Sequence, residues 1–306
     1  MRALLIVNPH ATSTTSRRRD LLAHALAGEV QLTVANTTER GHAVGLAAEA
    51  AADGVDLVVV HAGDGTVNEA VNGLLTRGLC DDAPMLAIVP GGSTNVFARA
   101  LGIDADPTQA TEQILEALQE KRFRRVSLGR ADDRYFTFNA GMGLDAAVVA
   151  EVEKQRAKGK TISNGMHIRE MMKLYLRSDR SHGELTVQLP DGEPVSGCHL
   201  AFISNVDPWT YFGNRPVRTN PGTSPTGGLG VFASRTLSPV PVSRVARQLL
   251  RRKGDPQHKH LLRADDVSEV TVSSDRPVGF QLDGDYLGER KSVNFSSVPR
   301  ALRVVV

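Results

Sequence analysis

The sequence has few cysteines and no long hydrophobic run. Only Cys80 and Cys198 are cysteines among its 306 residues, which is too few for a disulfide framework and favours a reducing compartment. No apolar stretch approaches the ~18–20 residues that span a bilayer. The apolar run at the start, residues 4–7, is too short for a signal peptide. We therefore expect a cytoplasmic protein.

An excess of charge of one sign is also missing. Thirty-six Lys and Arg against 34 Asp and Glu leave a net charge of +2, whereas a dedicated nucleic-acid-binding protein is usually more lopsided. Hydrophobic residues make up 41% and charged residues 23%, as in ordinary soluble proteins. This composition excludes a disordered chain, a collagen-like fibre and a coiled coil. At roughly 150 residues per domain, the length indicates two domains.

The first third alternates short apolar runs with alanine-rich stretches. Runs rich in Val, Ile and Leu predict strands buried on both faces, and the longer stretches between them predict helices. The strands are expected at 4–7, 30–35, 57–60 and 85–89, and the helices at 17–26, 42–52 and 67–75. This alternation is typical of βαβ units around a parallel sheet, in which ligands bind beyond the carboxyl ends of the strands.

Three polar loops follow the first, third and fourth of these strands. They read Asn8-Pro9-His10-Ala11-Thr12-Ser13, Ala62-Gly63-Asp64-Gly65-Thr66-Val67-Asn68-Glu69 and Pro90-Gly91-Gly92-Ser93-Thr94-Asn95. Glycines let the backbone approach a ligand closely, and each following helix points free N–H groups at the same space. Together the loops predict a cradle for phosphate oxygens. The alternative for any single loop is a tight turn with a helix cap.

Asp64 lies between two glycines of such a loop. A carboxylate there would repel a polyphosphate, so Asp64 is better explained as holding Mg²⁺ through water or holding a substrate hydroxyl. A second glycine pattern, Gly141-Met142-Gly143-Leu144-Asp145-Ala146, fits a dinucleotide-binding fingerprint but lacks the acidic strand end expected about 20 residues later. A turn into a helix explains that pattern equally well.

The ordered set of motifs resembles the bacterial diacylglycerol kinase family, which is related to sphingosine kinases and NAD kinases. Residues 62–69 and 90–99 carry most of the likeness. It extends to Asn8-Pro9, to Thr37 before Gly41-His42-Ala43, to residues 139–146 and to Leu282-Asp283-Gly284-Asp285. The markers occur in family order from residue 8 to residue 285.

The resemblance implies an α/β plus β fold in two domains. Residues 1–125, with 292–306 returning to them, would form a Rossmann-like α/β domain that binds ATP, and residues 126–291 a β-sandwich domain that receives the lipid. Short alternating segments at 184–189, 199–204, 269–273 and 278–282 agree with a sandwich. The implied nucleotide-site residues are Asn8, Pro9, Thr12, Thr37, Gly63, Asp64, Gly65, Thr66, Asn68, Glu69, Gly92, Ser93 and Asn95.

The implied activity is an ATP- and Mg²⁺-dependent lipid kinase that converts diacylglycerol to phosphatidic acid. Asp285 stands where the family's proton acceptor is usually Glu; Asp283 is a second candidate base, and Asp64 a Mg²⁺ ligand or alternative base. A turn capped by two aspartates is the structural alternative for Asp283 and Asp285. A different lipid alcohol, such as a long-chain base, and a non-catalytic nucleotide-binding regulator remain open. The stretch 225–231 lacks the carboxylate of the family's second metal site, so that site is expected to be lost or weak.

Two regions suggest contact with a membrane surface. Residues 239–263 hold seven basic residues against Asp255, a net charge of +6, with an apolar stripe at Val242, Val245, Leu249 and Leu250. This composition is typical of an interfacial helix on anionic lipid; a solvated surface helix or a contact in a homodimer are the alternatives. Residues 151–180 are rich in Met and Leu, which suits an acyl-chain pocket or an ordinary core.

Overall fold

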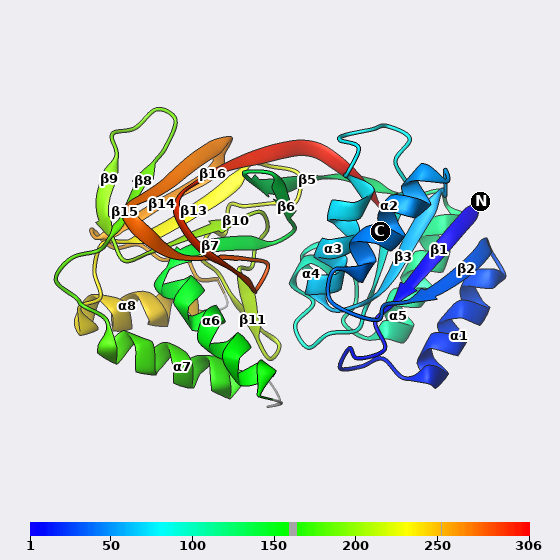
Figure 1. Ribbon diagram of the computed structural model, residues 1–306, viewed down its shortest axis with the longest axis horizontal. Helices are drawn as coiled ribbons and strands as arrows, with labels where there is room; N and C mark the ends of the chain where they lie inside the picture. The colour runs from blue at the N-terminus through cyan, green and yellow to red at the C-terminus, as the bar shows by residue number, and fades with distance from the viewer. Residues whose placement is uncertain (159–163, 252) are drawn as a thin grey trace. The chain divides into compact units, whose positions relative to one another are not determined.

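The computed structural model describes residues 1–158, 164–251 and 253–306 (Figure 1). The chain divides into two compact units. Unit 1 comprises Met1–Leu128 and Pro299–Val306, and unit 2 comprises Gly129–Val298. Both joins lie a few residues later than the division implied by the resemblance.

Unit 1 contains a parallel sheet in the order β2-β1-β3-β4-β16. Its strands are β1 (Arg2–Val7), β2 (Gln31–Asn36), β3 (Leu57–Ala62), β4 (Met85–Pro90) and the end of β16 (Asp285–Val304). The first four match the predicted runs. The prediction that these strands are buried on both faces is confirmed for β1, β3 and β4. It is wrong for β2, where Val34 is 43% exposed, because β2 is the edge strand and pairs only with β1.

Helices cover the sheet of unit 1. They are α1 (Ser16–Ala27), α2 (His42–Ala52), α3 (Asp64–Leu74), α4 (Val96–Ala100) and α5 (Pro107–Gln119). Leu26 of α1 and Ile114 of α5 pack in one hydrophobic core with alternate residues of β1, β3 and β4. Helices α2 and α3 pack tightly together, since a Cβ on Gly73 would lie 2.3 Å from the Val44 carbonyl oxygen. Glycine at position 73 therefore sets the spacing of this helix pair.

Unit 2 is rich in antiparallel strands, with the order β14-β13-β10-β7-β15-β16. These are β7 (Asn139–Gly143), β10 (Leu200–Ser204), β13 (Leu229–Ser234), β14 (Leu261–Val267) and β15 (Glu269–Leu282), with β8 (Leu185–Gln188) and β9 (Val195–Cys198) beside β15 and β6 (Arg134–Phe136) beside β5 (Arg124–Ala131). The strands β11 (Thr210–Phe212) and β12 (Arg215–Val217) form a separate pair. A buried cluster that includes Phe136, Met142, Val272 and Phe295 fills the interior.

Strand β15 corrects one expectation. Segments 269–273 and 278–282 are parts of one continuous strand rather than two strands separated by a turn. The strand pairs with β8 over residues 271–274 and with β7 over 280–282, and its register against β16 shifts between the two parts. A β-bulge or register shift of this kind bends a strand, so that its two halves can pair with different neighbouring strands.

Three helices complete unit 2: α6 (Leu144–Ala157), α7 (Asn164–Arg177) and α8 (Pro239–Leu249). Helix α6 packs on β7, β10 and β15, and α7 packs on α6 (Figure 1). Helix α8 has no buried residue. Within the ranges that the structure describes, no helix is long and apolar enough to cross a membrane.

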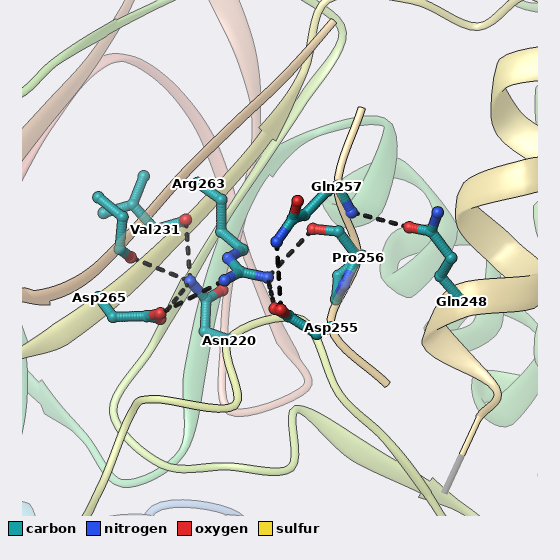
Figure 2. Close-up of polar contacts among 9 residues, drawn as sticks. Asn220, Val231, Gln248, Asp255, Pro256, Gln257, Arg263 and Asp265 are labelled. Carbon is teal, nitrogen blue, oxygen red and sulfur yellow. Dashed lines mark hydrogen bonds and ion pairs between the residues drawn. The ribbon is translucent and has the colours of Figure 1, made fainter. Parts of the chain in front are cut away.

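A polar network anchors the chain after α8 (Figure 2). The backbone N–H of Gln257 donates to Oε1 of Gln248 at 2.7 Å. Arg263 forms an ion pair with Asp255 and a longer one, 3.8 Å, with Asp265. The charge of Arg263 is therefore compensated, although it counted toward the basic stretch. Arg252, which also counted, lies outside the described residues.

Candidate functional site

The loops after β3 and β4 touch through their glycines. A Cβ on Gly91 would lie 2.9 Å from the Ala62 Cα, and one on Gly92 would lie 2.7 Å from the Gly63 Cα. Real Cβ atoms do not approach backbone this closely, and the Gly91 N–H donates to the Ala62 carbonyl at 2.8 Å. Two of the three predicted loops are therefore one structural unit at the carboxyl edge of the sheet.

Asn95 shapes the second of these loops. Its backbone has a φ of +49°, a left-handed conformation that asparagine tolerates better than most residues. Its side-chain oxygen accepts the Gly92 N–H at 2.9 Å, and its Nδ2 donates to the Gly92 carbonyl at 2.8 Å. The Asn95 side chain is thus used within the loop, while Ser93 at the tip is exposed.

Asp64 lies in the first turn of α3 and binds the start of α4. Its Oδ2 accepts the Val96 N–H at 3.0 Å and its Oδ1 accepts the Phe97 N–H at 3.3 Å. Among the described residues no group of three or more His, Cys, Asp or Glu side chains could hold a metal ion. This geometry favours a capping role for Asp64 over the expected roles as Mg²⁺ ligand or base.

Glu69 also caps a helix. Its side chain is only 8% exposed; Oε1 accepts the Gly41 N–H at 2.8 Å and Oε2 accepts the Ala43 N–H at 3.3 Å, at the start of α2. Two other expected nucleotide-site residues are buried as well, Thr37 at 6% and Asn68 at 1% exposure. These three side chains support the fold of the site rather than line its surface.

The first loop is joined to α3 through Asn8, whose Nδ2 donates to the Thr66 Oγ1 at 3.2 Å. Pro9 and Thr12 of this loop are exposed. Gly65 is half-buried, and a Cβ built on it would meet nothing within 4 Å. Because the first N–H groups of a helix have no intrahelical acceptor, the open start of α3 suits an anion.

His61 is a residue of this edge that the sequence reasoning missed. It is the second-last residue of β3 and is 1% exposed, with Nδ1 3.2 Å from the Val89 carbonyl oxygen and Nε2 3.3 Å from the Thr14 hydroxyl. Burial lowers the pKa of His61, so the neutral ring donates to Val89 from Nδ1 and accepts from Thr14 at Nε2. His61 thus connects β3, β4 and the segment after β1. In the sequence its only mark is a polar residue near the end of an apolar run.

In unit 2, Asp283 and Gly284 form the two-residue turn between β15 and β16. Their φ values, +48° and +80°, are those of a type I′ hairpin turn. The Asp283 carboxylate accepts four hydrogen bonds, from the Thr137 N–H and hydroxyl at 2.7 Å each, the Phe138 N–H at 2.9 Å and the Asn139 N–H at 3.0 Å. Burial raises the pKa of Asp283, against the opposing effect of these donors.

This saturated geometry fits the capped-turn alternative for Asp283. The side chain is 5% exposed, and four hydrogen bonds fill the usual acceptor sites of a carboxylate. The geometry therefore favours a structural role for Asp283, and its share in proton transfer stays a prediction. Asp285, the first residue of β16, is half-buried beside this turn. It remains the candidate base.

Asp145 and Gln281 form a second polar pair next to the turn. Gln281 donates to the Asp145 Oδ2 at 2.8 Å and accepts the Gly284 N–H at 3.0 Å. Burial raises the pKa of Asp145 to about 7. A Cβ on Gly141 would lie 2.0 Å from the same carboxylate oxygen. Gly141 thus makes room for this pair, which explains the glycine pattern without a dinucleotide.

The comparisons with known proteins agree with the geometry of unit 1. Residues 2–131 match the family model of the diacylglycerol kinase catalytic domain. This segment contains β1 to β4 and the joined glycine loops, and over it the resemblance seen in the sequence is confirmed.

Among similar proteins is the diacylglycerol kinase of Bacillus subtilis (strain 168), 40% identical over 108 residues. The match covers 35% of this chain and 33% of that protein, so the chain spans about a third of the length of this relative. A solved diacylglycerol kinase from Bacillus anthracis str. Sterne is 20% identical with a TM-score of 0.71, over 99% of this chain and 96% of that one. An NAD kinase from Archaeoglobus fulgidus in complex with ATP is 12% identical with a TM-score of 0.53, over 100% and 94%. The two structures show the shared fold.

Proposed function

We propose that the protein is a lipid kinase that transfers the γ-phosphate of ATP to a lipid hydroxyl, with diacylglycerol as the acceptor and phosphatidic acid as the product. The observation that carries this proposal is the junction of Ala62 with Gly91 and of Gly63 with Gly92, inside the segment that matches the diacylglycerol kinase catalytic domain. The name of the relative from Bacillus subtilis supports the acceptor.

ATP is the phosphate donor we infer. The NAD kinase from Archaeoglobus fulgidus, which has a similar fold, was solved in complex with ATP, and the first N–H groups of α3, beside the joined loops, have no intrahelical acceptor. We infer that Gly65 and the exposed Thr12 and Ser93 contact the phosphate oxygens. The capping side chains of Asp64 and Glu69 hold the helices around them.

We infer that the residues which the structure describes do not form a resident Mg²⁺ site. Both oxygens of Asp64 already accept backbone N–H groups, and the described residues contain no acidic or histidine cluster around it. Protein Mg²⁺ sites are commonly completed by substrate phosphates. We infer that Mg²⁺ enters this reaction as part of the nucleotide complex.

Asp285 is the proton acceptor in this proposal. The lipid hydroxyl oxygen forms a bond to the γ-phosphorus, the bond from that phosphorus to the β–γ bridging oxygen breaks, ADP leaves, and the hydroxyl proton passes to the Asp285 carboxylate. Asp283 holds the backbone of residues 137–139 beside the turn and so fixes where β16 begins. The protein supplies positioning and one base.

The test is a lipid-panel kinase assay. The protein is incubated with labelled ATP, Mg²⁺ and mixed micelles that contain diacylglycerol, a long-chain base or no acceptor, and NAD is offered separately in solution. Labelled phosphatidic acid is the expected product. Label on the long-chain base alone would change the acceptor, whereas label on NAD alone, or tight ATP binding without turnover on any lipid, would overturn the proposal.

A further inference from the structure

Helix α7 exposes an apolar face. Its residues Ile168, Met171, Met172 and Leu176 are 41%, 46%, 46% and 66% exposed. All four are large hydrophobic side chains that are exposed to solvent, and they lie within nine consecutive residues. The expected alternative of an ordinary core is thus wrong for these side chains.

The spacing places these residues on one side of the helix. Ile168, Met172 and Leu176 are four residues apart, and Met171 is three from Ile168, so they share a face. Glu170, two residues from both Ile168 and Met172, lies on the opposite side of α7 and is 2% exposed. Helix α7 packs on α6. The apolar face is therefore the one that α6 does not cover.

Cations flank this apolar face along α7. Arg169, Lys173 and Arg177 are exposed and follow the apolar positions 168, 172 and 176 by one residue each, so they form a neighbouring row. Glu170 pairs with Arg169 at 2.9 Å and with Lys173 at 3.5 Å. The described side chains of the row still carry more positive than negative charge.

Helix α8 extends the positive charge. The Tyr175 hydroxyl donates to the Leu237 carbonyl at 2.9 Å, just before α8 begins, so the two helices are neighbours (Figure 1). Exposed cations on and after α8 are Arg244, Arg247, Arg251, Lys253 and Lys259. Arg263 does not add to them, because Asp255 and Asp265 compensate it (Figure 2).

We propose that this surface, the apolar face of α7 with the cations of α7 and α8, docks on a bilayer that contains anionic lipid. A helix with an exposed apolar arc and a basic flank lies in the headgroup region with its apolar side inserted, and basic residues near it are attracted to anionic headgroups. A second copy of the chain is disfavoured, since a twofold contact on this face would bring the same cations together.

The inference rests on the proposed function only for its purpose, namely access to a lipid substrate; docking itself requires no ATP. Its test is co-sedimentation of the full chain with vesicles of phosphatidylcholine alone or mixed with phosphatidylglycerol. We expect binding to the mixed vesicles that weakens as salt is raised, and much less binding to phosphatidylcholine alone.

Two pairs of variants separate the apolar and the charged contributions. Leu176→Glu should weaken binding to mixed vesicles about tenfold, whereas Leu21→Glu, a matched change at a 61% exposed leucine of α1, should leave it unchanged. Replacing Arg247 and Arg251 together by Gln should weaken binding by roughly an order of magnitude. Replacing Arg290 and Lys291 together by Gln, at two exposed cations of β16, is the matched control.

The outcomes distinguish this inference from the proposed function. Turnover is measured separately on a water-soluble short-chain diacylglycerol without vesicles. Turnover on that substrate without vesicle binding would overturn the docking surface and leave the kinase proposal standing. Vesicle binding without turnover would overturn the kinase proposal and leave the docking surface standing. Equal loss in Leu176→Glu and Leu21→Glu, or a Leu176-dependent dimer in light scattering without vesicle binding, would also overturn the docking surface.

Discussion

Carboxylates bind backbone N–H groups in both units, but over very different separations along the chain. In unit 1, Asp64 accepts from residues 32 and 33 positions later, and each of its oxygens takes one N–H. In unit 2, Asp283 accepts from residues 144 to 146 positions earlier, and its two oxygens take four donors. Both carboxylates therefore hold backbone that is distant along the chain, but Asp283 binds a longer stretch of it from much further away.

The largest effect expected is on turnover, and it tests whether Asp285 rather than Asp283 is the base. Asp285→Ala should lower the rate of lipid phosphorylation about 10²- to 10⁴-fold, as loss of a general base does. The measurement is initial rate with labelled ATP and diacylglycerol. Unchanged unfolding by urea is the control, and full activity would exclude Asp285.

Asp283→Ala should act mainly on stability. The change leaves three backbone N–H groups and the Thr137 hydroxyl without their acceptor, at a cost on the order of 3–5 kcal/mol in the free energy of unfolding. Asp283→Asn, which keeps one acceptor oxygen, should lose less. Urea denaturation measures both. Lost turnover at unchanged stability would return Asp283 to the chemistry and remove the contrast with Asp64.

Asp64→Ala and Glu69→Ala form a matched pair in unit 1. Each removes the acceptor at a helix start, α4 for Asp64 and α2 for Glu69, and should destabilise the protein by about 1–2 kcal/mol. Thermal unfolding checks the size. ATP affinity of Asp64→Asn, measured by calorimetry with Mg²⁺, should fall only slightly; a large loss with intact stability would make Asp64 a metal ligand after all.

The last effect depends on pH and concerns Asp145. Because the pKa of Asp145 is raised to about 7, the folded state binds a proton that the unfolded state has lost above pH ~4. This group therefore lowers stability as pH rises between about 4 and 7, by at most about 1.4 kcal/mol per pH unit, and adds no further slope above pH 7. The difference in unfolding free energy between wild type and Asp145→Asn should follow that trend. A pH-independent difference would show that Asp145 titrates normally.

The features predicted correctly from sequence depend on neighbours along the chain. The four strands and three helices of unit 1 follow from periodicity, and the glycine loops from residues that lie within a few positions. The turn at Asp283 and Gly284 is likewise local, since Asp-Gly favours a two-residue hairpin.

What sequence could not supply depends on distant partners. Val34 appears buried from its run of apolar neighbours, but its exposure follows from the place of β2 at the sheet edge. The acceptors of the N–H groups at residues 137–139 lie at the other end of unit 2. Periodicity also places Leu176 on an apolar face of α7 without saying whether another element covers it. Such pairings are set by the three-dimensional fold.

Strand β16 has a consequence for the order in which the protein folds during synthesis. Its last residues complete the sheet of unit 1 beside β4, where Val304 pairs with Leu86 and the Val305 N–H donates to the Leu86 carbonyl at 2.9 Å. As the ribosome releases the chain, β4 emerges early and keeps an open edge until all of unit 2 has been translated. An unpaired edge of this kind invites aggregation. A fragment of residues 2–131, expressed alone, should therefore precipitate or bind chaperones far more readily than the intact polypeptide.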